Sequence, residues 1–331
     1  MAEVLYPVLS LNQNITGFLT KVISADIFGC VQSCLKNEVE LTDKGTHITS
    51  VASIEKSTDG KSSEVRLSSA YCQYFWLLCD VVIKILDRKV IAESCELYGI
   101  SIGDFLKGVE ETNKKTKEEV LPHVPDYYKP EIERYLAYLK IVPELLKTDF
   151  WDQAREEYIM AVSLADEKLQ INIDAINAID MKSKYSERTN SVYSYGIAFC
   201  MLHELAHHQL NHLEKAEEMQ DETDADAKAF WSIYKDIQGE ERFSANIGML
   251  CVFFSFMMLN PTLKEDNIHP REDKRMFAIY DAIVKENPKY TVLLVNILDF
   301  WAKMNQIEDY PKDLKLVEES VDIIKEYFKV K

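Results

Sequence analysis

The chain has 331 residues, of which 47% are hydrophobic and 28% are charged, and its formal net charge is −17. Its length suits one large domain or two ordinary ones, and its composition excludes a largely disordered chain. The negative charge argues against nucleic acid as the main partner, because a phosphate backbone would be repelled.

Ten glycines and nine prolines are few for this length, which favours helices over a loop-rich sandwich of sheets. The first hundred residues predict three elements. We expect a short helix within residues 14–37, and then a β-hairpin across 50–69, where two alternating runs flank a turn at 58–60. The apolar run Ala70–Asp87 predicts a long helix.

Residues 100–180 predict several amphipathic helices. Apolar residues recur at helical spacing in 100–121, 130–142 and 149–179. The junctions near Pro122–Pro130 and Pro143 predict loops. Four tyrosines of this region could contact a substrate, although an aromatic stripe of this kind more often belongs to a core. They are Tyr127, Tyr128, Tyr135 and Tyr138.

The last part of the chain also predicts helices. A polar break at 182–190 precedes an apolar helix that ends in several histidines, and a second helix fits Glu222–Asp236, with Gly239 as its end. The apolar run Ile247–Leu259 is too short to span a bilayer, which needs about 20 residues, so we expect a buried core helix and no membrane span. Two further helices are predicted at 271–287 and 313–330.

The seven cysteines indicate a reducing compartment. Their number is odd, most of them lie in apolar runs, and no CxxC pair is present. We therefore expect buried free thiols rather than disulfides or a thiolate metal site. The N-terminal stretch lacks the basic region and the cleavage site of a signal peptide. Both observations favour the cytoplasm.

The segment His203-Glu204-Leu205-Ala206-His207 matches the HExxH motif. Residues four apart lie on one face of a helix, so both imidazoles can reach one metal ion. Zn²⁺ accepts such ligands and leaves a fourth position open, and Glu204 can take a proton from the activated water and pass it to a leaving amine. A solvated helix with chance histidines is the alternative. The apolar run before the motif indicates a buried helix, in which these side chains are costly unless they are paired or bind metal.

Three residues around the motif admit two interpretations each. Gly196 lies seven residues before His203 on the same face, and it either permits the close approach of a neighbouring strand or is an ordinary packing glycine. His208 and His212 form a second pair four residues apart, turned by about 100° around the helix. They are either an accessory site or solvated and supporting residues.

The third metal ligand has to come from another segment. Leu210 and Leu213 stand where the extended HExxHxxGxxH pattern requires Gly and His, which excludes that arrangement. A carboxylate from a following helix is the alternative. The acidic candidates are Glu214, Glu217, Glu218, Asp221, Glu222, Asp224 and Asp226.

The stretch from Glu222 to Ala229 resembles the ExxADxxA signature of gluzincin metallopeptidases, most closely that of the HtpX/Ste24-type peptidases and their soluble relatives. In those families the glutamate is the third zinc ligand and the aspartate hydrogen-bonds the first histidine. The resemblance assigns these roles to Glu222 and Asp226. Helical spacing agrees, since the two share a face, and carboxylates behind a ligating histidine commonly fix its tautomer. Ala225 and Ala229 would let two helices pack closely.

A later element, His269-Pro270 followed by Arg275, resembles the HPxxxxR element of the same peptidases. The resemblance implies that both residues line or brace the active site, and that His269 stabilises the oxyanion of the tetrahedral intermediate. A helix that begins with Pro at its first position is the alternative. The motifs occur in matching order across about 195–280. Because transmembrane helices are not expected, the chain is similar to a soluble branch, the phage-exclusion Lit-type peptidases, which implies a specific host protein as the target.

We therefore expect a predominantly helical α+β fold, with a zincin-like metallopeptidase core, a small β-sheet and a helical insert. The expected parts are 1–99 with the hairpin and the long helix, a helical insert or cap at 100–185, and the zinc-binding part at 186–331. Zincins bind an extended peptide along the edge strand of a small sheet. Residues 63–68 are the expected edge, by analogy with that fold.

The expected function is hydrolysis of peptide bonds in a protein or peptide substrate by a soluble zinc-dependent endopeptidase, with Glu204 as general base and then general acid. Two alternatives stay open. One is a zinc hydrolase of another bond. The other is a regulatory or interaction domain whose zinc is structural or sensing, with His208, His212 or Asp226 as a fourth ligand. The oligomeric state is not predicted.

Overall fold

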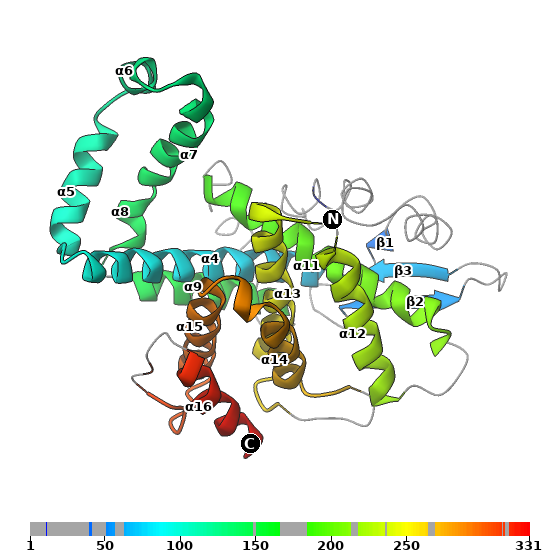
Figure 1. The fold of residues 1–331 in the computed structure, drawn as a ribbon. Coiled ribbons are helices and arrows are strands. Elements are labelled where there is room, and N and C mark those ends of the chain that lie inside the picture. The colour runs from blue at the N-terminus through cyan, green and yellow to red at the C-terminus, as the bar shows by residue number, and fades with distance from the viewer. Residues whose placement is uncertain are drawn as a thin grey trace.

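The computed structural model describes residues 11, 40–41, 51–56, 63–147, 150–165, 184–212, 218–235, 237–263, 269–312, 314 and 318–331. Helices dominate this part of the chain and the strands are few and short (Figure 1), so the predominantly helical fold is confirmed. The helix predicted within residues 14–37 and the turn at 58–60 lie outside the described residues.

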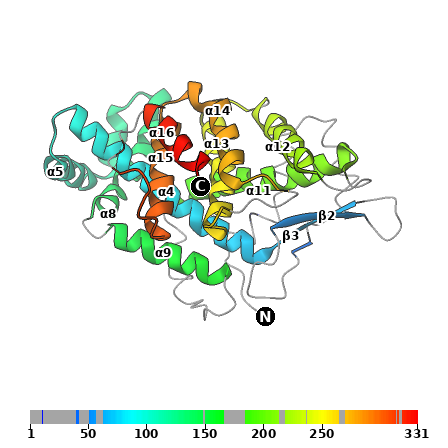
Figure 2. The same ribbon diagram turned by 90° about the horizontal axis from the view of Figure 1, so that it is seen from below.

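Three short strands lie side by side at one end of the molecule (Figures 1 and 2). β2 (Ala52–Lys56) and β3 (Ser63–Leu67), the two runs of the predicted hairpin, pair antiparallel. β1 (Glu40–Leu41) pairs parallel with the other side of β3. β3 is therefore central, and the prediction that 63–68 form the edge is wrong. The edge strand on the hairpin side is β2, because β1 takes the place beside β3.

The helix α4 (Ser69–Leu97) is the spine of the molecule and has 29 residues. Ser68 caps its first turn, since its hydroxyl accepts the backbone N–H of Tyr71 at 3.0 Å. Nearly every side chain from 71 to 86 is buried. The sequence locates this helix but ends it too early, at Asp87, because the residues that follow are only partly buried and look like a surface segment.

Four helices pack around α4 and bury it. They are α9 (Phe150–Ala165), α11 (Lys184–Gln209), α13 (Gly239–Leu259) and α15 (Lys289–Met304). Figure 2 shows α9 running along α4, and α11 and α13 crossing beside it. At the α11–α13 crossing, Gly196 approaches Gly248. The close neighbour of Gly196 is therefore a helix rather than the strand that we considered.

α13 is longer than the apolar run Ile247–Leu259 suggests, because it begins at Gly239. In the part of the chain that the structure describes, it is the one helix long and apolar enough to cross a membrane, and 72% of its most apolar window is buried inside the protein. The argument that this segment is too short to span a bilayer is therefore wrong, whereas its burial is that of a core helix.

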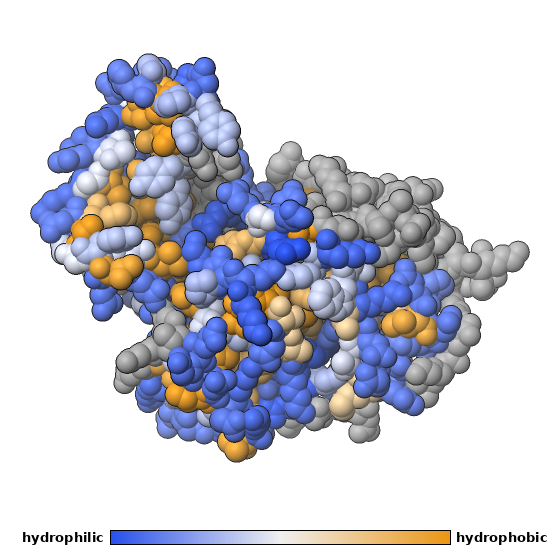
Figure 3. Space-filling view, in the orientation of Figure 1, coloured by the Kyte–Doolittle hydropathy of each residue, from blue (hydrophilic) through white to orange (hydrophobic). Residues whose placement is uncertain are grey.

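Helices α5–α8 form an arm that projects from one end of α4 (Figure 1). They are α5 (Ile102–Asn113), α6 (Lys117–Val120), α7 (Lys129–Leu139) and α8 (Val142–Leu145), with 3-10 turns at Leu121–His123 and Asp126–Tyr128. Pro143 lies inside α8, in its first turn, where a missing N–H costs nothing, so the loop predicted there is wrong. Figure 3 shows hydrophobic residues at the surface of this arm.

Three of the four tyrosines in this region are exposed, with Tyr127 at 86%, Tyr135 at 54% and Tyr128 at 51%. They therefore do not belong to a core, while Tyr138 packs against it. α9 lies in the same stretch of sequence as the arm but belongs to the body, against α4. The division into 1–99, 100–185 and 186–331 stays a prediction.

Several boundaries differ from the sequence predictions. α11 begins at Lys184, inside the predicted break at 182–190, because the polar residues there form the first turns of the helix. Gly239 begins α13, with φ at 60°, and does not end the preceding helix, α12 (Met219–Tyr234). The last helices are α14 (Glu272–Ile283), followed by a 3-10 turn at Val284–Glu286, and α16 (Glu318–Lys329). The sequence analysis missed α15.

Candidate metal centre

Two histidines of α11 meet at the end of the helix that lies next to the sheet. His203 and His207 are 8% and 6% exposed, and their Nε2 atoms lie 3.1 Å apart. Their spacing of four residues puts both rings on one face of α11. The apolar residues before them bury the helix, so the two polar rings lie in a dry environment, where they need partners.

Glu222 of α12 completes the group. Its Oε1 lies 3.2 Å from Nε2 of His207, and its Oε2 lies 3.4 Å from Nε2 of His203. Donor atoms of all three side chains lie within 4.8 Å of one another. A tetrahedral ion with bonds of about 2.0–2.1 Å would separate its donors by about 3.3 Å. Two imidazoles and one carboxylate at these distances fit a divalent metal.

α12 sets which carboxylate of the acidic run joins the histidines. Of the candidates that the structure describes, Glu222 alone belongs to the group, whereas Asp224 is exposed and accepts a hydrogen bond from Gln220. Ala225 and Ala229 are fully buried, and small side chains there let α12 pack against α11. Glu214 and Glu217 lie outside the described residues.

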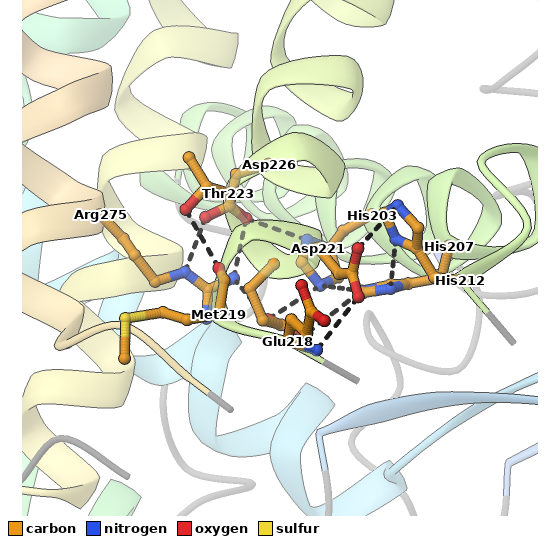
Figure 4. A network of polar contacts seen from close by, with 10 residues as sticks. His203, His207, His212, Glu218, Met219, Asp221, Thr223, Asp226 and Arg275 are labelled. Carbon is orange, nitrogen blue, oxygen red and sulfur yellow. Dashed lines mark hydrogen bonds and ion pairs between the residues drawn. The ribbon is translucent and has the colours of Figure 1, made fainter. Parts of the chain in front are cut away.

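Asp226 and Arg275 support the first histidine (Figure 4). Oδ1 of Asp226 lies 2.9 Å from Nδ1 of His203. Arg275, from α14, donates to both carboxylate oxygens of Asp226, from Nε at 2.7 Å and from Nη2 at 2.8 Å. The guanidinium also lies 3.4 Å from Glu222 and over the ring of Phe253. The contact predicted between Asp226 and His203 is present, and Arg275 braces that contact.

The ionisation of these groups follows from their contacts. Burial acts to lower the pKa of His203, but hydrogen bonds with Asp226 and Glu222 outweigh it and raise the pKa to about 10. Burial acts to raise the pKa of Glu222, but both histidines hold it well below its usual range. Burial has the same tendency at Asp226, and the charge of Arg275 lowers that pKa. The group therefore favours positive charge, as a cation site does.

Glu204 faces a cavity of about 440 Å³ beside the three donors. Its walls include Val51, Ala52 and Ser53 at the start of β2. Burial raises the pKa of Glu204, and the nearby histidines only partly oppose this. The position of Glu204, next to His203 on the turn that faces the cavity, suits a carboxyl group that exchanges protons with a molecule bound there.

His269 also lines this cavity, from the loop before α14, and its side chain is exposed. Arg275, whose side chain is largely buried, also lines this cavity. The structure therefore brings together all seven residues singled out from the motifs. The sequence predicted this grouping, because three separate segments carry motifs that resemble those of one class of peptidase and occur in the same order.

Two further residues, His212 and Asp221, lie behind His207, and the sequence had left their roles open. His212 is 4% exposed, and its Nδ1 lies 3.1 Å from Nδ1 of His207. Its Nε2 lies 3.3 Å from Oδ1 of Asp221. The expectation that His208 and His212 pair on one helical face is wrong, because α11 ends at Gln209. The one signal was Asn211, a residue type that favours a left-handed turn.

A family model described as Peptidase U49 matches residues 65–293. This range contains α4, the three donors and Arg275. The search of curated proteins and the search of solved structures give no match.

Proposed function

Because the chain belongs to the peptidase U49 family, we propose that it is a zinc-dependent endopeptidase that cleaves a protein substrate at the centre formed by His203, His207 and Glu222. Family membership supports peptide-bond hydrolysis, and the His-His-Glu group supports a metal in that reaction. The donor set of two imidazoles and one carboxylate is one that catalytic zinc commonly has.

The proposal depends most on where the other polar side chains around the three donors point. Both oxygens of Asp226 are held by His203 and Arg275, and His212 lies behind the ring of His207. Neither residue therefore offers a free fourth ligand, while Glu204 lines the cavity beside the donors. An open position favours a catalytic metal over a structural one, which is closed by four protein ligands.

Each residue then has one task. When bound, the metal supplies Lewis-acid chemistry, which polarises a carbonyl and makes a water molecule more acidic. His203, His207 and Glu222 hold it. Glu204 takes the proton of the attacking water and delivers it to the leaving nitrogen. His269, which lines the same cavity, donates a hydrogen bond to the oxygen that becomes negative.

We place the substrate along β2 rather than along β3. Val51, Ala52 and Ser53 line the cavity, and the outer edge of β2 lies away from β3. The carbonyl of Val51 accepts the N–H of Ser68 on the β3 side at 3.0 Å, and antiparallel ladders alternate. The N–H and C=O groups of Ala52 therefore point away from β3, where an extended peptide can pair with them.

The setting proposed is soluble and cytoplasmic. The cysteines that the structure describes are buried free thiols, as predicted for a reducing compartment. The motif resemblance to the Lit-type peptidases supports one specific host protein as the substrate and a role in phage exclusion.

The test compares three proteins: wild type, Glu204→Gln, and Glu187→Gln as a matched control on an exposed site of the same helix. Bound metal is measured first, and each protein is then incubated with a whole-cell lysate and new peptide termini are identified. We expect stoichiometric zinc in all three, with cleavage reduced about 10²–10⁴-fold in Glu204→Gln alone. Wild type without zinc would overturn the proposal. If all three proteins contain zinc and the lysates incubated with them show the same peptide termini, a regulatory domain would be favoured.

A further inference from the structure

We propose that His212 and Asp221 are positioning residues that fix the ring of His207 through a chain of two hydrogen bonds. This inference rests on the proposed function, because it concerns one of the proposed ligands. Nδ1 of His207 lies 3.1 Å from Nδ1 of His212, and Nε2 of His212 lies 3.3 Å from Oδ1 of Asp221. Figure 4 shows these three side chains in one network of polar contacts.

The backbone turn after α11 brings His212 to this position. The helix closes with the N–H of Leu210 bonded to the carbonyl of Ala206 at 2.9 Å. Asn211 then has φ at 59°, a left-handed conformation that Asn adopts more readily than most residues. It reverses the chain, so His212 folds back against His207 instead of continuing away from it. The buried side chain of His212 is a consequence of this turn.

Asp221 is held in place independently of His212. It lies in the first turn of α12 and is 3% exposed. Its Oδ2 accepts the backbone N–H of Glu218 at 3.0 Å, as part of a capping box. The positive end of the helix dipole stabilises a carboxylate there. Oδ1 remains directed at His212. The first turn of α12 therefore holds in place the acceptor at the end of this series of hydrogen bonds.

The direction of the two hydrogen bonds follows from the donor role of His207. Its Nε2 is the atom that faces His203 and Glu222, so the proton of the neutral ring resides on Nδ1. That N–H needs an acceptor, and Nδ1 of His212 is the neighbouring one. His212 is then neutral with its own proton on Nε2, which points at Asp221. With a metal on Nε2 of His207, this pair of tautomers would give each of the two hydrogen bonds one donor and one acceptor.

The two histidine donors are thus supported in different ways. His203 contacts a carboxylate directly, because Asp226 lies 2.9 Å from its Nδ1. His207 reaches its carboxylate through a second imidazole. Hydrogen bonds behind a ligating histidine fix its orientation and its basicity, and their loss typically lowers metal affinity by about 10–100-fold. His212 therefore contributes to metal binding without touching the metal.

The experiment measures metal affinity rather than activity. The dissociation constant for Zn²⁺ is determined by chelator competition for wild type, His212→Phe and His212→Asn. Phenylalanine keeps a ring and removes both nitrogens, whereas asparagine keeps an acceptor at the δ position. His208→Phe is the matched control, because it makes the same substitution at a partly exposed histidine next to His207 on α11. The absorption spectrum of each Co²⁺-loaded protein reports the ligand geometry.

We expect His212→Phe to bind Zn²⁺ about 10–100-fold more weakly than wild type, with a changed Co²⁺ spectrum and an unchanged melting temperature of the metal-free protein. His212→Asn should recover most of the affinity, and His208→Phe should match wild type. Equal affinity of wild type and His212→Phe would overturn the inference, as would an equal loss in His208→Phe.

Asp221→Asn supplies a second variant if His212→Phe does not fold. It keeps the size of the side chain and weakens its acceptor, so its Zn²⁺ affinity should fall, and wild-type affinity in this variant would also overturn the inference. The two proposals fail in different ways. Wild type without Zn²⁺ binding removes the proposed function, whereas tight binding by wild type and by every variant removes the role of His212 alone.

Discussion

Gly196 of α11 and Gly248 of α13 face each other where the two helices cross. A Cβ atom on Gly248 would lie 2.9 Å from the backbone nitrogen of Gly196 and 2.5 Å from the carbonyl oxygen of Val192. A Cβ atom on Gly196 would lie 2.4 Å from the ring of Phe75. The absence of side chains at both glycines therefore sets how closely the helix that carries the histidines approaches the core helix α13.

Gly248→Ala should destabilise the protein. The added methyl group meets backbone atoms, which cannot move without shifting a helix, and overpacking of this kind costs about 1–3 kcal/mol in the free energy of unfolding. Gly108→Ala is the control, since a methyl group there meets no atom within 4 Å and alanine favours the helix. Urea denaturation measures both. Equal stability of wild type and Gly248→Ala would contradict the close helix contact.

Glu222→Gln should abolish tight metal binding, because an amide oxygen is a weaker zinc ligand than a carboxylate and the buried histidines lose their anionic partner. The loss should exceed the range of about 10–100-fold that is typical of supporting residues. Asp224→Asn removes the same charge from an exposed position on the same helix, and it should bind zinc like wild type. Isothermal titration with Zn²⁺ distinguishes the two variants.

Arg275→Met should destabilise the metal-free protein by about 3–5 kcal/mol, because the buried carboxylate of Asp226 loses both hydrogen bonds from the guanidinium and keeps only His203 as a partner. Arg275→Lys should recover only part of this, since an ammonium group cannot bind both oxygens as the guanidinium fork does. Adding Asp226→Asn to Arg275→Met removes the buried charge that Arg275 no longer balances. If the double variant is no more stable than Arg275→Met in urea denaturation, the two residues do not form the pair described.

Removal of metal should lower the melting temperature of the wild-type protein. A ligand that binds only the folded state stabilises it by about 2.7 kcal/mol at a free concentration of 100 Kd. The difference between chelator and added Zn²⁺ should persist in Glu204→Gln, which keeps all three donors, and should vanish in Glu222→Gln. Differential scanning calorimetry measures the shift, and an equal shift in both variants would place the metal elsewhere.

Ala52→Pro should weaken substrate use without affecting the metal. Proline removes an N–H that points away from β3, and edge strands tolerate it there. We expect a lower kcat/KM, mainly through a higher KM, because pairing along β2 contributes to binding the substrate. Zinc content and melting temperature should stay at wild-type values. An unchanged KM would argue against substrate addition to this strand.

Most residues of the candidate metal centre could be predicted from the sequence, because short local motifs carry them. His203 and His207 follow from a spacing of four residues, and Asp226 from a signature on a second helix. His212 was misread because helical spacing assumes that the helix continues, whereas one left-handed residue, Asn211, ends it. The periodicity of side chains does not report such a turn.

The errors in the fold have a similar origin. The alternation in 50–69 identified both strands of the hairpin, but strand order depends on which segment pairs with the second side of β3, and two residues of β1 give no pattern. The helices α4, α11 and α13 were each predicted too short. The sequence analysis left their outer turns outside the predicted helices, since composition alone does not show that the backbone continues.

The three donor residues lie close together in the sequence, whereas Arg275, which braces Asp226, lies much farther along the chain. His207 follows His203 by four residues and Asp226 follows it by 23, whereas Arg275 comes 49 residues after Asp226. Bringing nearby segments together costs little loop-closure entropy, and the cost grows with chain separation. The His-His-Glu group is thus a low-contact-order feature of α11 and α12, whereas its brace depends on α14, a segment much farther along the chain.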